Sequence, residues 1–131
     1  HPGSRLSVLV EVSCSNPNEK AITLIHDIAM QIAAMNPTYI TREDVSAEHL
    51  QKEIEIYKEL AINEGKKPEI AERIAQGRVE KFYQDQCLVE QAFVKDAAKT
   101  VNDVVAEISK EMGSDVKILS FRRYFLGESL D

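Results

Sequence analysis

The chain has 131 residues, the length of one ordinary domain, and hydrophobic and charged residues make up 44% and 29% of it. Its formal net charge of −6 argues against a general nucleic-acid-binding protein, because neutralising phosphates needs an excess of Lys and Arg. Cys14 and Cys87 lack C-x-x-C spacing and so indicate neither a zinc site nor a disulfide framework, and no apolar run approaches the roughly 20 residues that span a bilayer.

The first predicted element is a strand over residues 6–12, where β-branched residues partly alternate with others between two turn-forming stretches. A helix is predicted next, beginning after Pro17 and Asn18, because apolar residues recur there at spacings of three and four. Its apolar face is wide, which predicts burial on most sides. Asn36 and Pro37 should end it.

Two further helices should form an antiparallel hairpin over about residues 46–87. Ser46 is a suitable N-cap for the first helix, and Gly65 and Pro68 suit the reversal between the two. The apolar positions form a narrow stripe, typical of a coiled-coil seam, so the hairpin should protrude from the body and Gly77 should let the two backbones approach closely. The predicted seam positions are Leu50, Ile54, Tyr57 and Ala61 in the first helix, and Ile70, Ile74, Gly77, Val79, Phe82 and Tyr83 in the second.

An irregular stretch is predicted at residues 87–96, followed by a last helix that Thr100 caps and Gly113 ends. Residues 117–126 then read as a long strand that can pair with the first. The predicted fold class is α+β, with a small antiparallel sheet of about three strands, helices packed on one face, and a protruding antiparallel helical hairpin. We expect residues 1–131 to form a single domain that carries the hairpin as an insert.

Motifs of common active sites are missing from the sequence, including G-x-G-x-x-G, G-K-[ST], G-x-S-x-G and H-E-x-x-H. Glutamates such as Glu53 and Glu59 lie near lysines, as in surface charge pairs. We therefore predict no catalytic residue, metal ligand or cofactor. A small hydrolase is an alternative only if two carboxylates with shifted pKa values meet in one pocket. Arg122 and Arg123 beside aromatic residues could dock RNA, but an ordinary half-exposed strand shows the same pattern.

Specific strings of residues span nearly the whole chain in a familiar order. They are HPGSRLSVLVEV at 1–12, HDIAMQIAAMNPTYI at 26–40, EDVSAEHLQKE at 43–53, NEGKKPEIAERIAQGRVEKFY at 63–83, CLVEQAFVKDAAKTV at 87–101 and MGSDVKILSFRRYFLGE at 112–128. Together they resemble translation elongation factor Ts, including its D-[IL]-A-M signature, its hairpin with the G-R pair and its closing strand. The resemblance implies a partner, the GTPase EF-Tu, whose GDP release the family promotes through differential binding without a catalytic residue.

The departures from the family pattern concern the parts nearest the nucleotide. The family carries N-C-E-T-D-F-V-A after the corresponding strand, whereas this chain has Ser13 to Asn18 as S-C-S-N-P-N. The family's small N-terminal domain with T-G-A-G-M-M-D is absent, and the chain begins without Met, which predicts a piece of a longer protein. The resemblance is thus greatest to the C-terminal core subdomain of a long-type factor, which docks on the third domain of EF-Tu. A short-type factor that lost the motif is the second possibility.

The resemblance also implies contact positions for EF-Tu, with ordinary turn or sheet packing as the alternative for each. They are His1, Arg5, Val8, Val10, Met112 and Gly113. Other implied properties are a possible homodimer, no direct nucleic-acid or membrane partner, and a location in the bacterial cytoplasm or in an organelle. A structural or homodimerising module that does not engage EF-Tu is the alternative function.

Overall fold

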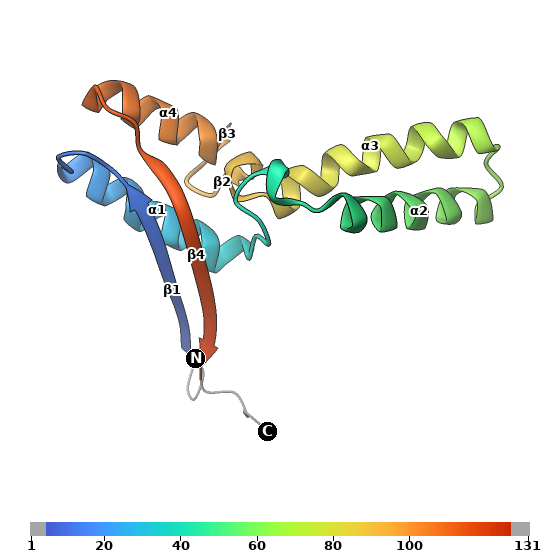
Figure 1. Ribbon diagram of the computed structural model, residues 1–131, viewed down its shortest axis with the longest axis horizontal. Coiled ribbons are helices and arrows are strands. Elements are labelled where there is room, and N and C mark those ends of the chain that lie inside the picture. The colour runs from blue at the N-terminus through green and yellow to red at the C-terminus, as the bar shows by residue number, and fades with distance from the viewer. Residues whose placement is uncertain (1–4, 127–131) are drawn as a thin grey trace.

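The computed structural model describes residues 5–126 and is built around a long antiparallel ribbon of two strands (Figure 1). Strand β1 (Arg5–Ser13) pairs with β4 (Lys117–Leu126), with Arg5 opposite Leu126 at one end and Ser13 opposite Lys117 at the other. The register shifts once, between Glu11 and Val12. The predicted pairing of the first and last strands is therefore confirmed.

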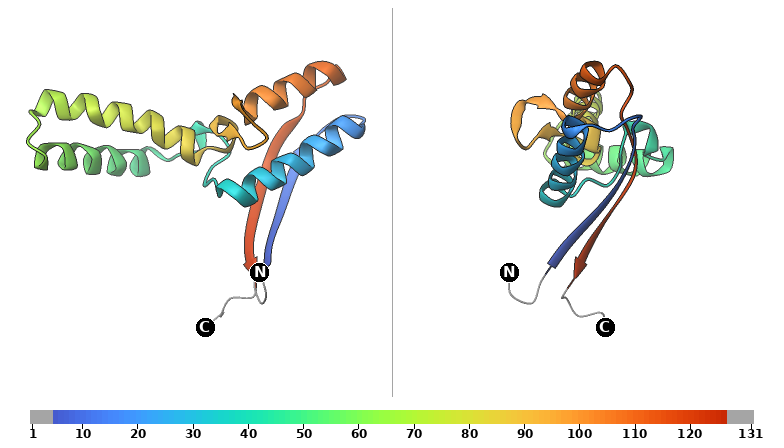
Figure 2. Two further views of the ribbon diagram at one scale, coloured as in Figure 1. Left: turned by 180° about the vertical axis from the view of Figure 1, so that it is seen from behind. Right: turned by 90° about the vertical axis from the view of Figure 1, so that its left-hand side faces the viewer.

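Two helices cover one face of this ribbon, as the end-on view in Figure 2 shows. Helix α1 (Glu19–Met35) begins where the Asn18 side chain accepts a hydrogen bond from the Ala21 N–H at 3.0 Å, and it ends at Asn36 in the left-handed conformation. The predicted start and end of this helix are both confirmed.

Helix α4 (Val101–Met112) has a capping box in which Thr100 and Asp103 each bond the other's backbone N–H. It stops at Gly113, whose φ of 69° is the left-handed cap that glycine adopts without strain. Both boundaries again agree with the sequence prediction.

The core lies between the ribbon, α1 and α4. Its buried side chains are Leu24, Ile28, Ile32, Leu88, Phe93, Val101, Val105 and Val116, and inward residues of both strands pack against them. Because a two-stranded ribbon is at best marginally stable alone, this contact is what holds β1 and β4 in place.

A second small sheet replaces the irregular stretch predicted at residues 87–96. The short 3-10 helix η2 (Leu88–Glu90) leads into β2 (Ala92–Phe93), which pairs antiparallel with β3 (Asp96–Thr100). The α+β class is confirmed, although the strands are divided between two sheets of two strands each. The Gln31 side chain donates a hydrogen bond to the Ala92 C=O and accepts one from the Val94 N–H. These two backbone groups are therefore satisfied by a side chain and not by a third strand.

The predicted hairpin is present and extends away from the body (Figure 1). It consists of α2 (Ala47–Asn63) and α3 (Pro68–Gln86), and the connector before it contains the 3-10 helix η1 (Arg42–Asp44). Ser46 accepts a hydrogen bond from the His49 N–H, Gly65 takes a φ of 90° in the turn, and Pro68 opens the second helix. None of the helices described between residues 5 and 126 is long and apolar enough to cross a membrane.

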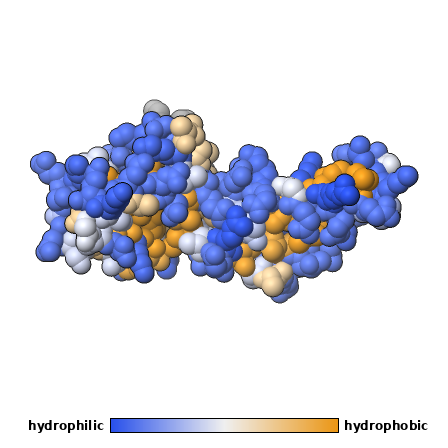
Figure 3. Space-filling view, turned by 90° about the horizontal axis from the view of Figure 1, so that it is seen from above, coloured by the Kyte–Doolittle hydropathy of each residue, from blue (hydrophilic) through white to orange (hydrophobic). Residues whose placement is uncertain are grey.

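The seam of the hairpin differs from the prediction on the α3 side. Val79 is buried as predicted, but the other buried residues are Ala71 and Ala75, whereas Ile70 is 40% exposed. The two alanines were missed because the prediction followed the spacing of large apolar residues. Seen from above, the arm is largely hydrophilic, with apolar side chains in a strip along it and near its tip (Figure 3).

The predicted role of Gly77 is wrong. A Cβ placed on Gly77 would meet nothing within 4 Å, so no neighbouring backbone requires a glycine there. The residue lies in the middle of α3 and its φ is not positive. Its lack of a side chain therefore costs helix stability without a compensating contact within the described residues.

Gly77→Ala should raise the free energy of unfolding by up to about 1 kcal/mol, because alanine loses less backbone entropy in a helix. Guanidinium unfolding followed by circular dichroism measures this. Gly65→Ala is the matched control and should destabilise the protein, since alanine is strained at a φ of 90°. Equal effects at the two glycines would contradict the explanation.

Shortening the hairpin should leave the body folded. The rings of His49 and Phe82 lie 5.5 Å apart, so residues 51–81 can be replaced by a short Gly-Ser linker across the base of the arm. We expect one cooperative urea transition with a smaller m-value, because less surface is exposed on unfolding. A loss of cooperative unfolding would show that the arm is not an insert in an independent domain.

Candidate functional site

The face of the ribbon that turns away from the helices is open. Val8, Val10 and Val12 pack against the core, so alternation along the strand places Leu9 on the opposite face, where it is 63% exposed. Arg122 lies opposite Leu9 in the register, and Tyr124 lies opposite Ser7. An apolar side chain and an aromatic one therefore lie on the same uncovered face.

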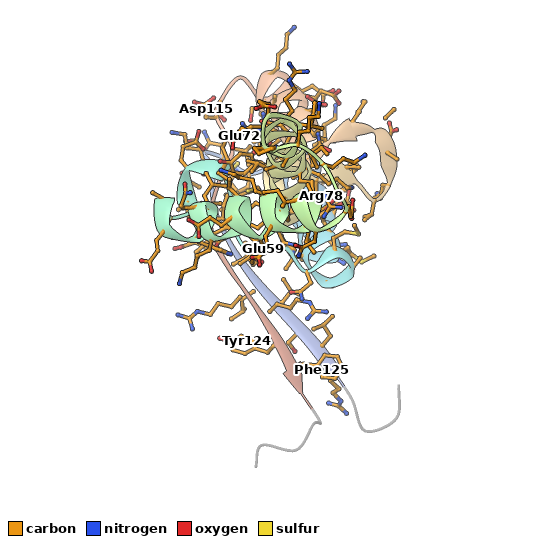
Figure 4. All side chains as sticks on the ribbon, turned by 90° about the vertical axis from the view of Figure 1, so that its right-hand side faces the viewer. Glu59, Glu72, Arg78, Asp115, Tyr124 and Phe125 are labelled. Atoms are coloured by element: carbon orange, nitrogen blue, oxygen red, sulfur yellow. The ribbon has the colours of Figure 1, made fainter. Side chains whose placement is uncertain are left out.

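The free end of the ribbon extends beyond the helices and exposes further apolar groups. Figure 4 shows Tyr124 and Phe125 below the helical body, on the part of the ribbon that no helix covers. Leu6 faces Phe125 across the two strands, and both are exposed. Alternation places Leu6 and Phe125 on the same face as Val8, and Tyr124 on the opposite, open face with Leu9. We call the following exposed residues of the open face the ribbon surface: Arg5, Leu9, Leu119, Arg122 and Tyr124.

Arg123 does not belong to this surface, because its side chain turns toward α1. Its Nη2 donates a hydrogen bond to the Ala33 C=O at 3.3 Å, in the last turn of the helix. A cation is favourable at that end of a helix dipole. Arg122 and Arg123 thus alternate between the two faces, as in the ordinary half-exposed strand that was the alternative to an RNA-docking strand.

A groove at the base of the hairpin contains two carboxylates, those of Glu53 and Asp85. Each is already paired, Glu53 with the His49 ring at 3.5 Å and Asp85 with Lys81 at 3.0 Å. Burial, followed by a hydrogen bond to Glu53, raises the pKa of Tyr57 to about 12. These contacts are those of charge pairs on a helix surface, and they do not form the convergent pair of carboxylates that a hydrolase would need.

The described residues 5–126 contain no group of three His, Cys, Asp or Glu side chains arranged to hold a metal ion. The ribbon surface is therefore the candidate binding site, because its side chains are exposed and include apolar and aromatic groups. Its mixture of apolar, aromatic and cationic side chains is typical of the residues enriched at protein–protein interfaces.

The family model described as elongation factor TS matches residues 1–128. The chain belongs to the elongation factor Ts family.

Several bacterial relatives named elongation factor Ts share this sequence along its whole length. The protein of Desulforamulus reducens is 47% identical over all of this chain, and that of Moorella thermoacetica is 44% identical over 99% of it. The protein of Chloroherpeton thalassium is 48% identical over 98% of the chain. The matched part makes up 62%, 66% and 44% of these relatives, respectively, so the chain is shorter than each of them.

The structure separates the contact positions that the resemblance to elongation factor Ts implies. Arg5 is exposed at the free end of the ribbon, whereas Val8 and Val10 face inward and are partly buried against the core. Met112 is half-buried at the end of α4, and Gly113 is exposed next to it. His1 lies outside the described residues.

These positions do not converge on one point. Arg5 lies at one end of β1, while Gly113 precedes the start of β4 at the other end of the ribbon. A nine-residue strand is about 30 Å long, so a partner that touches both needs an extended surface. The outward residues Leu9, Arg122 and Tyr124 lie between them and were not singled out as contacts for EF-Tu. Because side chains alternate between the two faces of a strand, the inward valines would have indicated that Leu9 faces outward.

Proposed function

We propose that this chain is the EF-Tu-docking core of an elongation factor Ts and that it contributes to GDP release in protein synthesis. The observation that supports this most directly is the ribbon surface, where Leu9 and Tyr124 are exposed on the open face in a member of this family. Burial of such side chains stabilises an interface, and aromatic residues and arginine are common binding hot spots. The cations Arg5 and Arg122 favour an acidic patch on the partner.

In this proposal the chain acts by differential binding and makes or breaks no bond. A surface that fits nucleotide-free EF-Tu better than EF-Tu·GDP lowers the affinity for GDP by the same free energy with which GDP weakens the complex. Coupling energies of this kind are about 1–3 kcal/mol, which corresponds to about 5- to 150-fold in affinity. No cofactor is needed, and the site of action would be the bacterial cytoplasm or the interior of an organelle.

Binding to two forms of EF-Tu tests this function. The chain is titrated onto immobilised nucleotide-free EF-Tu and onto EF-Tu·GDP, and the release of fluorescent GDP is followed in parallel. We expect tighter binding to the nucleotide-free form. The acceleration of release should be smaller than that of a factor with the family's Asp-Phe segment, because residues 13–18 read S-C-S-N-P-N at that place. Equal binding to both forms, or binding to neither, would overturn the proposal.

A homodimerising module of an elongation factor Ts, without exchange activity, is the second candidate. The observation that favours it is the open ribbon, in which β1 and β4 pair only with each other among the described residues, so each has an unpaired edge. Light scattering during size-exclusion chromatography distinguishes the two functions. A stable dimer that fails to bind EF-Tu would support the module.

A further inference from the structure

The hairpin meets the body at a point that could bend. Helix α3 ends at Cys87, which is extended with φ −101° and ψ 116°, and the short helix η2 begins at the next residue. Leu88 in η2 is fully buried in the core, so η2 moves with the body. Helical segments joined by one extended residue can change their relative direction unless other contacts span the joint, and such element ends are where hinges lie.

Two side chains span this joint. The Gln91 Nε2 donates a hydrogen bond to the Asp85 C=O at 2.8 Å, only two residues before Cys87, and Arg42 reaches farther along α3. The Arg42 guanidinium, from η1, donates two hydrogen bonds to Glu90 in η2, from Nη2 at 2.6 Å and from Nε at 2.9 Å. It also bonds Glu80 in α3, from Nη1 at 3.4 Å and Nη2 at 3.3 Å. Its Cζ lies 4.3 Å from the ring centroid of Tyr83 in the same helix. Arg42 therefore holds a residue on each side of Cys87.

The geometry of these contacts distinguishes them from a single surface ion pair, which usually contributes little. Arginine presents a planar fork that matches a carboxylate with two parallel bonds, and its face stacks on an aromatic ring. The Glu90 side chain is 22% exposed, so solvent screens its pairing with Arg42 less than it screens the pairing with Glu80, which is 58% exposed. The two carboxylates also hold the pKa of Arg42 above its usual range, so its charge persists at every working pH.

The hydrogen bonds between Arg42 and Glu80 lie at a distance from the joint, so they can restrain bending of the arm effectively. The backbone bonds at the base, such as Tyr39 N–H to Gln86 C=O at 2.9 Å and Leu88 N–H to Tyr39 C=O at 2.8 Å, lie at the joint itself. Bonds at a pivot restrain rotation about it weakly. Glu80 is seven residues before Cys87, about 10 Å along the helix axis, so a bond there resists bending more effectively. The hydrogen bond between the Tyr39 hydroxyl and the His49 ring of α2 is a further contact that lies away from the joint.

We propose that Arg42 is a positioning residue that fixes the direction in which the hairpin leaves the body. Without it, the arm still folds but samples a wider range of directions. A partner that contacts both the arm and the ribbon would then meet a fixed geometry and would not have to order it on binding. The proposal concerns the free protein, so it stands or fails independently of EF-Tu binding.

Distances between spin labels measure the direction of the arm. Lys66→Cys at the hairpin tip and Ala106→Cys on α4 give two exposed labelling sites, with Cys14→Ser removing a competing thiol. Cys87 should stay unlabelled near neutral pH, because it is buried and its pKa is raised to about 11. We expect a single narrow distance distribution in the parent protein. Arg42→Ala should broaden this distribution and shift its mean.

Three further variants make the result specific. Arg42→Gln keeps most of the side-chain length without the charge and should behave as Arg42→Ala does, while Arg42→Lys should give an intermediate width because it lacks the fork. Glu72→Gln is the control, since it breaks an exposed pair with Lys58 at 2.9 Å that lies wholly within the arm. Circular dichroism verifies that all variants fold. An unchanged distribution in Arg42→Ala, or equal broadening in Glu72→Gln, would overturn the proposal.

Discussion

Gln31→Leu should lower the free energy of unfolding by about 3 kcal/mol, because it leaves several buried polar groups without partners. Gln31 and Gln91 are both almost completely buried. The Gln31 Nε2 donates to the Gln91 Oε1 at 3.1 Å and to the Ala92 C=O at 3.0 Å, and its Oε1 accepts from the Val94 N–H at 2.8 Å. Leucine has a similar volume but can satisfy none of these groups.

The same network links three parts of the fold, which is why the effect should be large. Gln91 donates to the Asp85 C=O at 2.8 Å near the end of α3, and its own C=O accepts from the Val101 N–H at the start of α4. Gln31 lies on α1. Loss of one member of a buried network leaves the others desolvated and unpaired, so the cost exceeds that of one exposed hydrogen bond.

Guanidinium unfolding followed by circular dichroism and fluorescence measures this change. Gln51→Leu is the matched control, because Gln51 is exposed on α2 and should change stability by less than about 0.5 kcal/mol. A Gln31→Leu protein as stable as the Gln51→Leu protein would show that leucine packing compensates for the lost network.

Leu9→Asp should weaken binding to nucleotide-free EF-Tu at least about thirtyfold, the effect of losing a hot spot worth about 2 kcal/mol. Leu9 is 63% exposed and lies on the open face beside Arg122. A carboxylate at this position would have to be desolvated in the interface. It would also repel the acidic patch that Arg5 and Arg122 favour.

Ile22→Asp is the control for this experiment, because Ile22 on α1 is 62% exposed, nearly the same as Leu9, and lies away from the open face. Calorimetry or surface plasmon resonance compares the two variants with the parent chain. Both should keep the parent fold, since each side chain already lies in water. Equal losses of affinity would indicate a non-specific charge effect, and an unchanged affinity for Leu9→Asp would place the interface elsewhere.

Local signals in the sequence were sufficient for the boundaries of the four α-helices, although not for the short elements between residues 88 and 100. Ser46 and Thr100 cap the helices that they were predicted to cap, and Asn18 caps the helix that was predicted to begin after it. Asn36 and Gly113 end their helices in the left-handed conformation. These boundaries depend on hydrogen bonds within a few residues, so the sequence specifies them without reference to the rest of the fold. The family was likewise determined by strings of residues in order.

Contacts between distant segments could be known only from the tertiary structure. Spacing predicted Val79 in the seam of the hairpin correctly, but it also placed Gly77 and Ile70 there and missed Ala71 and Ala75, because packing against the other helix decides which side chains are buried. The contact of Arg42 with Glu80 and Glu90 joins residues 38 and 48 positions apart, and no local pattern indicates it. The open face of the ribbon was also undetermined, because a strand's alternation shows that it has two faces but not which one the helices cover.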